Sequence, residues 1–165
     1  MERTYTSKIL HTPIGDMLAV ASEDGIHQLE FVEGSKNAGH ITLTDVSEGS
    51  TKDLEELEKQ LTEYFNGKRK EFDLPLVAFG SAFQQNAWQA LLDIPYGETI
   101  SYKEEALHAG NEKAVRAVGH ANGANAIAIV IPCHRVIGSN GKLGGYGGGL
   151  WRKQWLLDHE RSHNK

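Results

Sequence analysis

The first half of the chain alternates short apolar runs with compact polar stretches. The apolar runs occupy residues 5–10, 17–21 and 26–32, and the segments between them, T-P-I-G and S-E-D-G, are typical of turns. This pattern predicts three antiparallel strands joined as a meander. The polar segment 34–50 predicts a loop, in which residues 41–43 are a candidate strand.

An amphipathic helix follows this loop. Ser50 and Asp53 have the spacing of a capping box, which marks the start of a helix. The apolar positions that then recur at helical spacing are Leu54, Leu57, Leu61 and Tyr64. The helix ends at N-G, residues 66–67, and the basic-then-apolar segment 68–76 predicts one more strand.

A change of pattern at residues 77–81 predicts a boundary between two domains, 1–80 and 81–165. Beyond it, a first helix is predicted, which ends at an I-P-Y-G turn. One face of this helix carries the apolar residues Phe83, Ala87, Ala90 and Leu91. S-Y-K-E at 101–104 is a strict capping box for a second helix. G-N then ends that helix and caps a third one over residues 112–122.

The second and third helices have the outline of a helix-turn-helix unit, whose second helix enters a DNA groove. The same outline occurs in many helical proteins, so DNA binding and simple packing both stay open. The third helix is unusual in its small side chains, which are Ala114, Ala117, Gly119, Ala121 and Gly123. Such a helix can lie close to another backbone, with the long Arg116 projecting from it, although packing on a neighbouring helix explains the composition equally well.

The apolar stretch A-I-A-I-V-I at residues 126–131 predicts a buried strand. Pro132 ends this strand and places Cys133, the only cysteine, at a constrained turn. A single cysteine is often an inert buried residue. However, His134 and Arg135 follow at once, and an imidazole can take the proton of a thiol, whose thiolate is a strong nucleophile. Adjacent side chains on extended chain face opposite ways, so this pairing requires a backbone turn or an intervening water.

Seven glycines occupy the twelve residues 138–149. N-G at 140–141 predicts a hairpin wing that pairs 136–137 with 142–143. The other glycines can offer backbone N–H groups to a flat ligand, although the Walker phosphate-loop pattern is absent. A last helix is predicted over 150–160. Its positions at core spacing are Trp151, Trp155 and Leu156.

Composition narrows the class of protein. A length of 165 residues with 39% hydrophobic and 24% charged residues is typical of one or two globular domains. One cysteine excludes an intramolecular disulfide and a multi-cysteine zinc site, and no run resembles a signal peptide or a membrane span, so we expect a cytoplasmic protein. The net charge of −5 disfavours nucleic acid, but residues 1–80 hold 8 Lys and Arg against 15 Asp and Glu, whereas residues 81–165 hold 9 against 7. The second half can therefore accept a polyanion.

Four segments of the second half form one pattern: R-A-V-G at 116–119, I-P-C-H-R-V at 131–136, G-Y-x-G-G-L at 145–150 and W-L-L-x-x-E at 155–160. Together they resemble the O6-alkylguanine-DNA alkyltransferases, also called methylated-DNA–protein-cysteine methyltransferases. The resemblance covers residues 82–162, and the first half matches in outline only. It implies an α+β fold, with an N-terminal antiparallel sheet and helix of ribonuclease H-like outline and a C-terminal, mostly helical, winged helix-turn-helix domain.

The resemblance implies a single-turnover DNA-repair enzyme that needs no cofactor and no metal. Cys133 would take the alkyl group from O6-methylguanine in duplex DNA as a stable thioether, so the protein is consumed; O4-methylthymine is a candidate second substrate. His134 would act through a water as the base, Glu160 would orient it, and Tyr102 would give a proton to the leaving guanine. We expect a monomer with no membrane partner.

The resemblance also implies that the target base is flipped out of the duplex. Arg116 would fill the gap while its helix lies in the minor groove. Asn125 would brace the turn before the active-site segment, and Val136 and Tyr146 would line the base pocket. Many relatives have serine where this chain has Gly147, so only a backbone N–H can donate there, and bulkier alkyl groups are expected to fit. The zinc site of some relatives is not expected without a second cysteine.

Three other interpretations compete with this one. An alkyltransferase-like damage sensor would carry tryptophan in place of Cys133. A winged-helix transcriptional regulator would explain the helix-turn-helix but not the cysteine or the glycine-rich loop. A cysteine hydrolase would need an oxyanion hole, and no local motif of those families surrounds Cys133.

Overall fold

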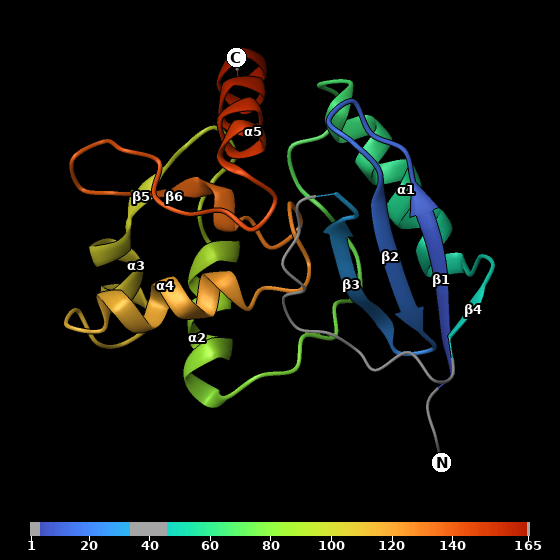
Figure 1. The fold of residues 1–165 in the computed structure, drawn as a ribbon, viewed down its shortest axis with the longest axis horizontal. Coiled ribbons are helices and arrows are strands. Elements are labelled where there is room, and N and C mark those ends of the chain that lie inside the picture. Colours follow the sequence, from blue (N-terminus) through green and yellow to red (C-terminus); the bar gives the residue numbers. More distant parts are fainter. Residues whose placement is uncertain (1–3, 34–45, 165) are drawn as a thin grey trace.

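The computed structural model describes residues 4–33 and 46–164, which form two adjoining halves (Figure 1). The elements follow in the order β1 (Tyr5–Leu10), β2 (Met17–Ser22), β3 (Gly25–Phe31), β4 (Val46–Glu48), α1 (Lys52–Phe65), α2 (Ala82–Leu92), β5 (Ile100–Ser101), α3 (Tyr102–His108), α4 (Val115–Gly123), the 3-10 helix Cys133–Arg135, β6 (Val136–Ile137) and α5 (Leu150–His163). The candidate strand at 41–43 lies outside the described residues. Within those residues no helix is both long and apolar enough to cross a membrane.

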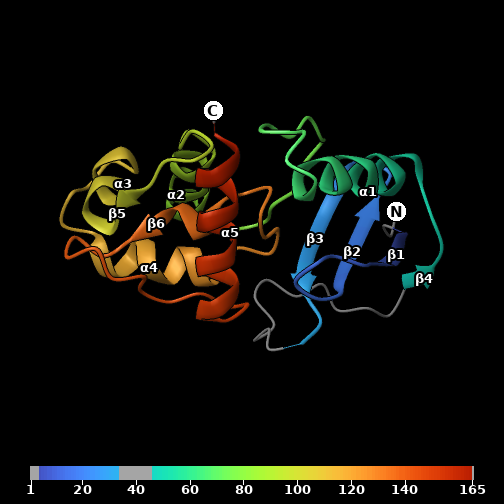
Figure 2. The ribbon, with the colours of Figure 1, turned by 90° about the horizontal axis from the view of Figure 1, so that it is seen from above.

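The N-terminal half is a sheet with the strand order β3-β2-β1-β4, and α1 lies across one of its faces (Figure 2). β1, β2 and β3 pair antiparallel, which confirms the predicted meander. β4 adds a fourth strand parallel to β1, so the sheet is mixed rather than wholly antiparallel. Its three residues, V-S-E, are too few and too polar to show a strand pattern in the sequence.

Two local predictions in this half are wrong. The N-cap of α1 is Thr51 rather than Ser50, because the Thr51 side chain accepts a hydrogen bond from a backbone N–H of the first turn. Residues 68–76 form no strand and make a single bridge to Ile26 of the sheet. Pro75 has no N–H to extend a ladder, and the apolar side chains of the segment pack against the core instead.

The C-terminal half is built on α2, α3 and α4. They pack through small buried side chains, which are Ala87, Ala106, Ala109, Val118 and Ala121. The predicted capping box of α3 is present, with Ser101 and Glu104 each bonded to the backbone of the other. α4 begins at Val115 instead of residue 112, because Asn111 caps a preceding turn, in which its Oδ1 accepts from the Lys113 N–H at 3.0 Å.

Residues 126–131 are largely buried, as predicted, but they form turns rather than a strand. Only Ile127 bridges β3, and Ile129 has a φ of 71°. Asn125 holds this arrangement, since its Nδ2 donates to the Ile131 carbonyl at 2.8 Å and its Oδ1 accepts from the Ile127 N–H at 3.0 Å. A buried apolar run can therefore turn when a polar side chain satisfies its backbone.

The predicted hairpin wing is also different. β6 pairs in parallel with β5 and not with residues 142–143. N-G at 140–141 does form a turn, in which Gly141 has a φ of 82° and the Gly138 N–H donates to the Lys142 carbonyl at 2.7 Å. The predicted turn is therefore present, but β6 pairs with a strand that is more distant in the sequence than residues 142–143.

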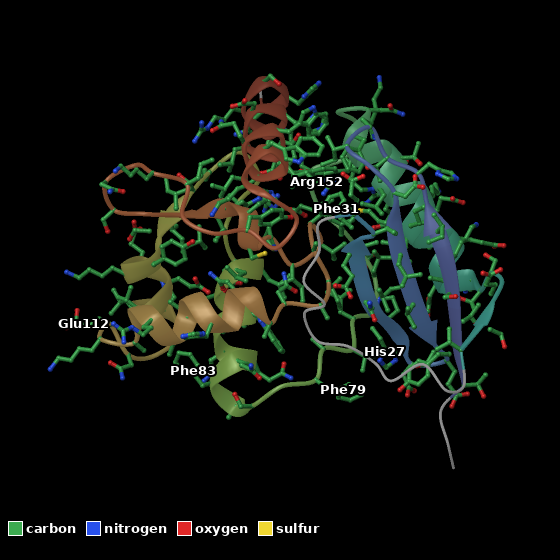
Figure 3. The ribbon with its side chains drawn as sticks, viewed as in Figure 1. His27, Phe31, Phe79, Phe83, Glu112 and Arg152 are labelled. Carbon is green, nitrogen blue, oxygen red and sulfur yellow. The ribbon has the colours of Figure 1, made fainter. Side chains whose placement is uncertain are left out.

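α5 lies on the side of the C-terminal half that faces the sheet (Figure 2). Arg152 joins the halves, because its Nε donates to the Ile14 carbonyl at 2.7 Å and its guanidinium lies 4.5 Å from the Phe31 ring centre (Figure 3). Trp151, predicted to be core, is 58% exposed. The helix instead buries Arg152, Lys153, Leu156, Leu157, His159 and Glu160. The α+β fold class, with a sheet and helix followed by a helical half, is confirmed.

Candidate active site

A cavity of about 380 Å³ lies between α3, α4 and the glycine-rich loop. Its lining brings together the predicted residues Tyr102, Cys133, Tyr146 and Gly147, and adds Asn122 and bare glycine backbone. This volume falls within the ~300–1,000 Å³ typical of ligand pockets. A larger cavity of about 440 Å³, beside Tyr96 and Arg135, is not lined by Cys133. We therefore place the chemistry in the smaller one.

A turn of the backbone separates the two key side chains. Cys133 opens the 3-10 helix directly after Pro132, and successive side chains of such a helix point about 120° apart. Cys133 is thus partly exposed at the cavity, whereas His134 is fully buried. Burial raises the pKa of the Cys133 thiol, although the Asn125 side chain and the Lys153 charge lower it in part. The thiol form prevails at neutral pH, so a base is needed to produce the nucleophile.

His134 is held in one orientation by Glu160. Its Nε2 lies 2.7 Å from Glu160 Oε2, and burial lowers the pKa of His134 although the carboxylate opposes this shift. A carboxylate can only accept, so Nε2 carries the proton and the neutral ring presents its lone pair at Nδ1. Nδ1 is buried and has no hydrogen-bonding partner among the described residues. This arrangement can act as a base.

Five donors converge on the Glu160 carboxylate. Tyr64 of α1 donates its hydroxyl at 2.7 Å, and the Gly97 N–H donates at 3.3 Å. Arg135 adds Nε at 2.8 Å and Nη2 at 3.1 Å, and His134 supplies the fifth bond. Burial alone would raise the pKa of Glu160, but the contacts with His134 and Arg135 lower it well below its usual range. Glu160 is therefore ionised at every physiological pH.

Lys153 holds the glycine-rich loop through hydrogen bonds to its backbone carbonyls. It is fully buried in α5, and its Nζ donates to the carbonyls of Leu143 and Gly145. Burial lowers the pKa of Lys153 to about 8, although Cys133 and Glu105 raise it in part. The ammonium therefore adds a positive charge near the thiol and fixes the loop that faces it.

Tyr102 and the glycine-rich loop are in close contact. Gly144 has a φ of 73°, and a Cβ at this position would collide with the Tyr102 hydroxyl, so glycine is required there. Burial raises the pKa of Tyr102, and a hydrogen bond with the Gly145 backbone lowers it in part. By contrast, a Cβ at Gly147 would meet open space. Glycine at 147 thus leaves room that a side chain could occupy.

The remaining predicted residues take separate positions. Asn125 is buried and braces the turn before Cys133. Val136 is fully buried in β6 and is not part of the cavity lining. Arg116 is exposed on α4, also outside the lining. The structure thus gathers four predicted residues around the cavity and two more, His134 and Glu160, behind Cys133.

The site also contains three residues that the sequence patterns had not assigned to it, Tyr64, Arg135 and Lys153. Tyr64 is separated from Glu160 by 96 residues, but a tyrosine on a predicted core face needs a partner for its hydroxyl. Lys153 lies on the same helix face as Leu157, one turn away, which would have predicted its burial. In the described part of the chain, no three His, Cys, Asp or Glu side chains group as metal ligands.

Comparison with known proteins gives close relatives of the whole chain. A methylated-DNA–protein-cysteine methyltransferase of Methanosarcina barkeri is 46% identical over 155 residues, which cover 94% of this chain and 96% of the relative. The constitutive methyltransferase of that name from Bacillus subtilis is 45% identical over 151 residues, 91% and 92% of the two chains. The crystal structure of Mycobacterium tuberculosis OGT in complex with DNA matches with a TM-score of 0.86 and 42% identity, over 97% of this chain and 94% of that one.

Two family models match the chain in succession. The ribonuclease-like domain of 6-O-methylguanine DNA methyltransferase matches residues 4–78, and the DNA binding domain of the same family matches residues 82–162. The two matches account for most of the sequence, and the relatives extend over nearly all of it. The chain therefore belongs to the 6-O-methylguanine DNA methyltransferase family.

Proposed function

We propose that this protein repairs O6-methylguanine in duplex DNA by moving the methyl group irreversibly to Cys133. The observation that carries the proposal is the position of the only cysteine, at a cavity and next to a buried histidine that a carboxylate orients. Membership of the family and the similarity to a relative solved with DNA support the same function.

The proton of the thiol passes to His134. Because Nε2 is engaged with Glu160, Nδ1 is the basic atom, and we assign the transfer to a water between it and Cys133. The lowered pKa of His134 keeps the ring neutral and able to accept. The ionised Glu160 stabilises the imidazolium that forms.

Methyl transfer forms one S–C bond and breaks one O–C bond. The Cys133 thiolate attacks the methyl carbon from the side opposite O6, and the electron pair of the O–C bond leaves with guanine. The Tyr102 hydroxyl, which borders the cavity, is the donor for the guanine anion. Sulfur in a thioether is a poor leaving group, so the methyl group stays and each molecule reacts once.

The DNA-facing element is α4. Its glycines Gly119 and Gly123 line the cavity, and a Cβ at either would meet open space, which suits close approach of a nucleic acid backbone. Arg116 is exposed on the same helix and can fill the gap left by a flipped base.

The variant Arg116→Ala should slow repair of a duplex substrate more than repair of a single-stranded substrate. Equal losses would contradict a role in flipping.

Replacement of the acceptor tests the proposal. Cys133→Ala should still bind a duplex that contains O6-methylguanine but should transfer no methyl group, as judged by the mass of the tryptic peptides. In the wild-type protein the added methyl mass should lie on the peptide that contains Cys133. Transfer by the variant, or methylation of another peptide, would contradict the assignment.

Several finer points belong to the proposal. We propose a division into domains between residues 80 and 81, a monomer, and a cytoplasmic location.

The free space at Gly147 supports acceptance of alkyl groups larger than methyl. A Gly147→Ser variant should retain methyl transfer and lose rate mainly with O6-benzylguanine; equal rates with both substrates would remove the role of this position.

A further inference from the structure

Glu105 is a second buried carboxyl near the site, and no step above uses it. It is fully buried in α3, one turn after Tyr102. Its Oε1 accepts a hydrogen bond from Asn122 Nδ2 at 2.7 Å, which joins α3 to α4. Within the described residues, Glu105 Oε2 and Asn122 Oδ1 are buried without a hydrogen-bonding partner. One hydrogen bond from a neutral amide offsets little of the free energy that it costs to bury an ionised carboxylate.

Only one hydrogen bond separates Glu105 from the reaction cavity. Asn122 lines that cavity together with Cys133 and Tyr102. Its amide is tied to Glu105, so the carboxyl sets the position of one wall element. A change in the charge or position of Glu105 can therefore alter the cavity wall through Asn122, although Glu105 itself does not line the cavity.

The charged and titratable groups that act on Glu105 come from three elements. They are Lys153 of α5, Cys133 of the 3-10 helix and Tyr102 of α3 itself. α4 contributes the uncharged Asn122, and α2 packs against α3 through apolar side chains. Burial raises the pKa of Glu105 to about 7, against the lowering effects of Asn122 and Lys153. A negative charge on Glu105 in turn raises the pKa values of Cys133 and Tyr102.

We propose that Glu105 is a positioning residue of the alkyl-transfer site, which holds Asn122 in the cavity wall and, when ionised, opposes formation of the Cys133 thiolate. This inference rests on the proposed transfer to Cys133. It means that the wild-type protein gains less reactivity from a rise in pH than the thiol alone would gain.

The test compares Glu105→Gln with the wild-type protein between pH 5.5 and 7.5. Glutamine retains an acceptor for Asn122 but cannot ionise, and the upper limit stays below the pH at which Lys153 loses its charge. Two rates are measured at each pH: single-turnover methyl transfer from an O6-methylguanine duplex, and alkylation of Cys133 by iodoacetamide without DNA. The matched control is Glu104→Gln, an exposed neighbour whose capping role an amide can keep.

The ratio of the Glu105→Gln rate to the wild-type rate should be near one at pH 5.5 and should rise about twofold to fivefold by pH 7.5 in both assays, because removal of a nearby negative charge favours the thiolate. The control ratio should stay near one. A ratio that is constant or falls with pH would overturn the inference. If the wild-type protein transferred no methyl group, the proposed function would fail, while the iodoacetamide rates would still decide the role of Glu105.

A direct titration guards against a variant that does not fold. In the wild-type protein labelled with 13C at glutamate carboxyls, the Glu105 signal should titrate with a midpoint near 7, the value to which burial raises its pKa. A midpoint below 5 would overturn the inference whatever the variant does, because Glu105 would then be charged throughout the working range.

Discussion

Glu160, which contacts His134, and Glu105, which acts on Cys133, are both fully buried carboxyls, yet their surroundings shift their pKa values in opposite directions. Glu160 accepts five hydrogen bonds, two of them from Arg135, and its pKa falls far below the usual range. Glu105 accepts one hydrogen bond from a neutral amide, and its pKa rises to about 7. Burial alone does not set the charge of a carboxyl; the donors around it do.

This difference assigns two roles. We propose that the permanently ionised Glu160 fixes the tautomer and orientation of His134, as a base in a nucleophilic site requires. A carboxyl that titrates near neutral pH can instead adjust the charge around Cys133 and Lys153. The first proposed role does not change with physiological pH, and the second does.

The largest expected effect comes from Glu160→Gln. The change leaves the buried Arg135 guanidinium without its counter-charge, which should lower the free energy of unfolding by about 3–5 kcal/mol. Loss of the oriented base should slow methyl transfer by a factor on the order of 10² or more. Urea unfolding and single-turnover assays measure both quantities.

Asp158→Asn is the matched control, since Asp158 is an exposed carboxyl on the same helix. It should change neither the stability nor the rate appreciably. A Glu160→Gln variant with the rate of the control would show that Glu160 has no role in orienting His134.

Tyr64→Phe should have an intermediate effect. It removes one of the five donors to Glu160 and the one that comes from the N-terminal half. A hydrogen bond to a charged group contributes about 1.5–3 kcal/mol, so the free energy of unfolding should fall within that range. Methyl transfer should slow less than in Glu160→Gln, because Arg135 still holds the carboxylate.

Tyr5→Phe, in a partly exposed strand position, serves as the control for Tyr64→Phe. If the two variants had equal stability and equal rates, the contact between the halves through Glu160 would carry no energy.

The smallest expected effect is the pH dependence of stability at Glu105. A raised pKa in the folded state means that the contribution of Glu105 is fully present below about pH 4.5 and is lost as the pH rises through about 7. For Glu160, whose folded pKa is lowered, the contribution is lost instead as the pH falls. Glu105→Gln should therefore gain about 1–2 kcal/mol in stability relative to wild type between pH 5.5 and pH 7.5.

Urea unfolding at the two pH values measures this gain. A difference between Glu105→Gln and wild type that did not change with pH would show that Glu105 keeps an ordinary pKa in the folded protein.

Local patterns predicted much of the fold. The three-stranded meander, the apolar face of α1 and the capping box of α3 each depend on residues close together in sequence, and each is present. The failures involve partners that are distant in sequence: β4 pairs with β1 at one edge of the sheet, and β6 pairs with β5 rather than with residues 142–143. Residues 126–131 carry a strand-like apolar run, but the Asn125 side chain supplies backbone bonds that a ladder would have made.

For the site, too, local patterns predicted the residues that lie close together in the sequence and did not predict the distant ones. The residues next to Cys133 indicated a thiol and a base, paired through a backbone turn or an intervening water. The 3-10 helix supplies a turn, and the proton transfer that we propose still uses a water. Glu160 joined the site only through the family resemblance, since 26 residues separate it from His134. Glu105 could not be assigned from the sequence, because its significance lies in burial and in charges that come from other helices. For Lys153 the helix face predicts burial, but not the loop carbonyls to which its Nζ donates.

The proposed role of Cys133 is to accept a single methyl group and to keep it. It is tested most directly by adding increasing excess of a duplex with O6-methylguanine to the protein and counting methyl groups per molecule by intact mass, with peptide mapping of the product. The number of methyl groups per molecule should reach a plateau at one, on the peptide that contains Cys133. Continued turnover beyond one equivalent, or an unmodified Cys133 in protein that has repaired its substrate, would contradict it.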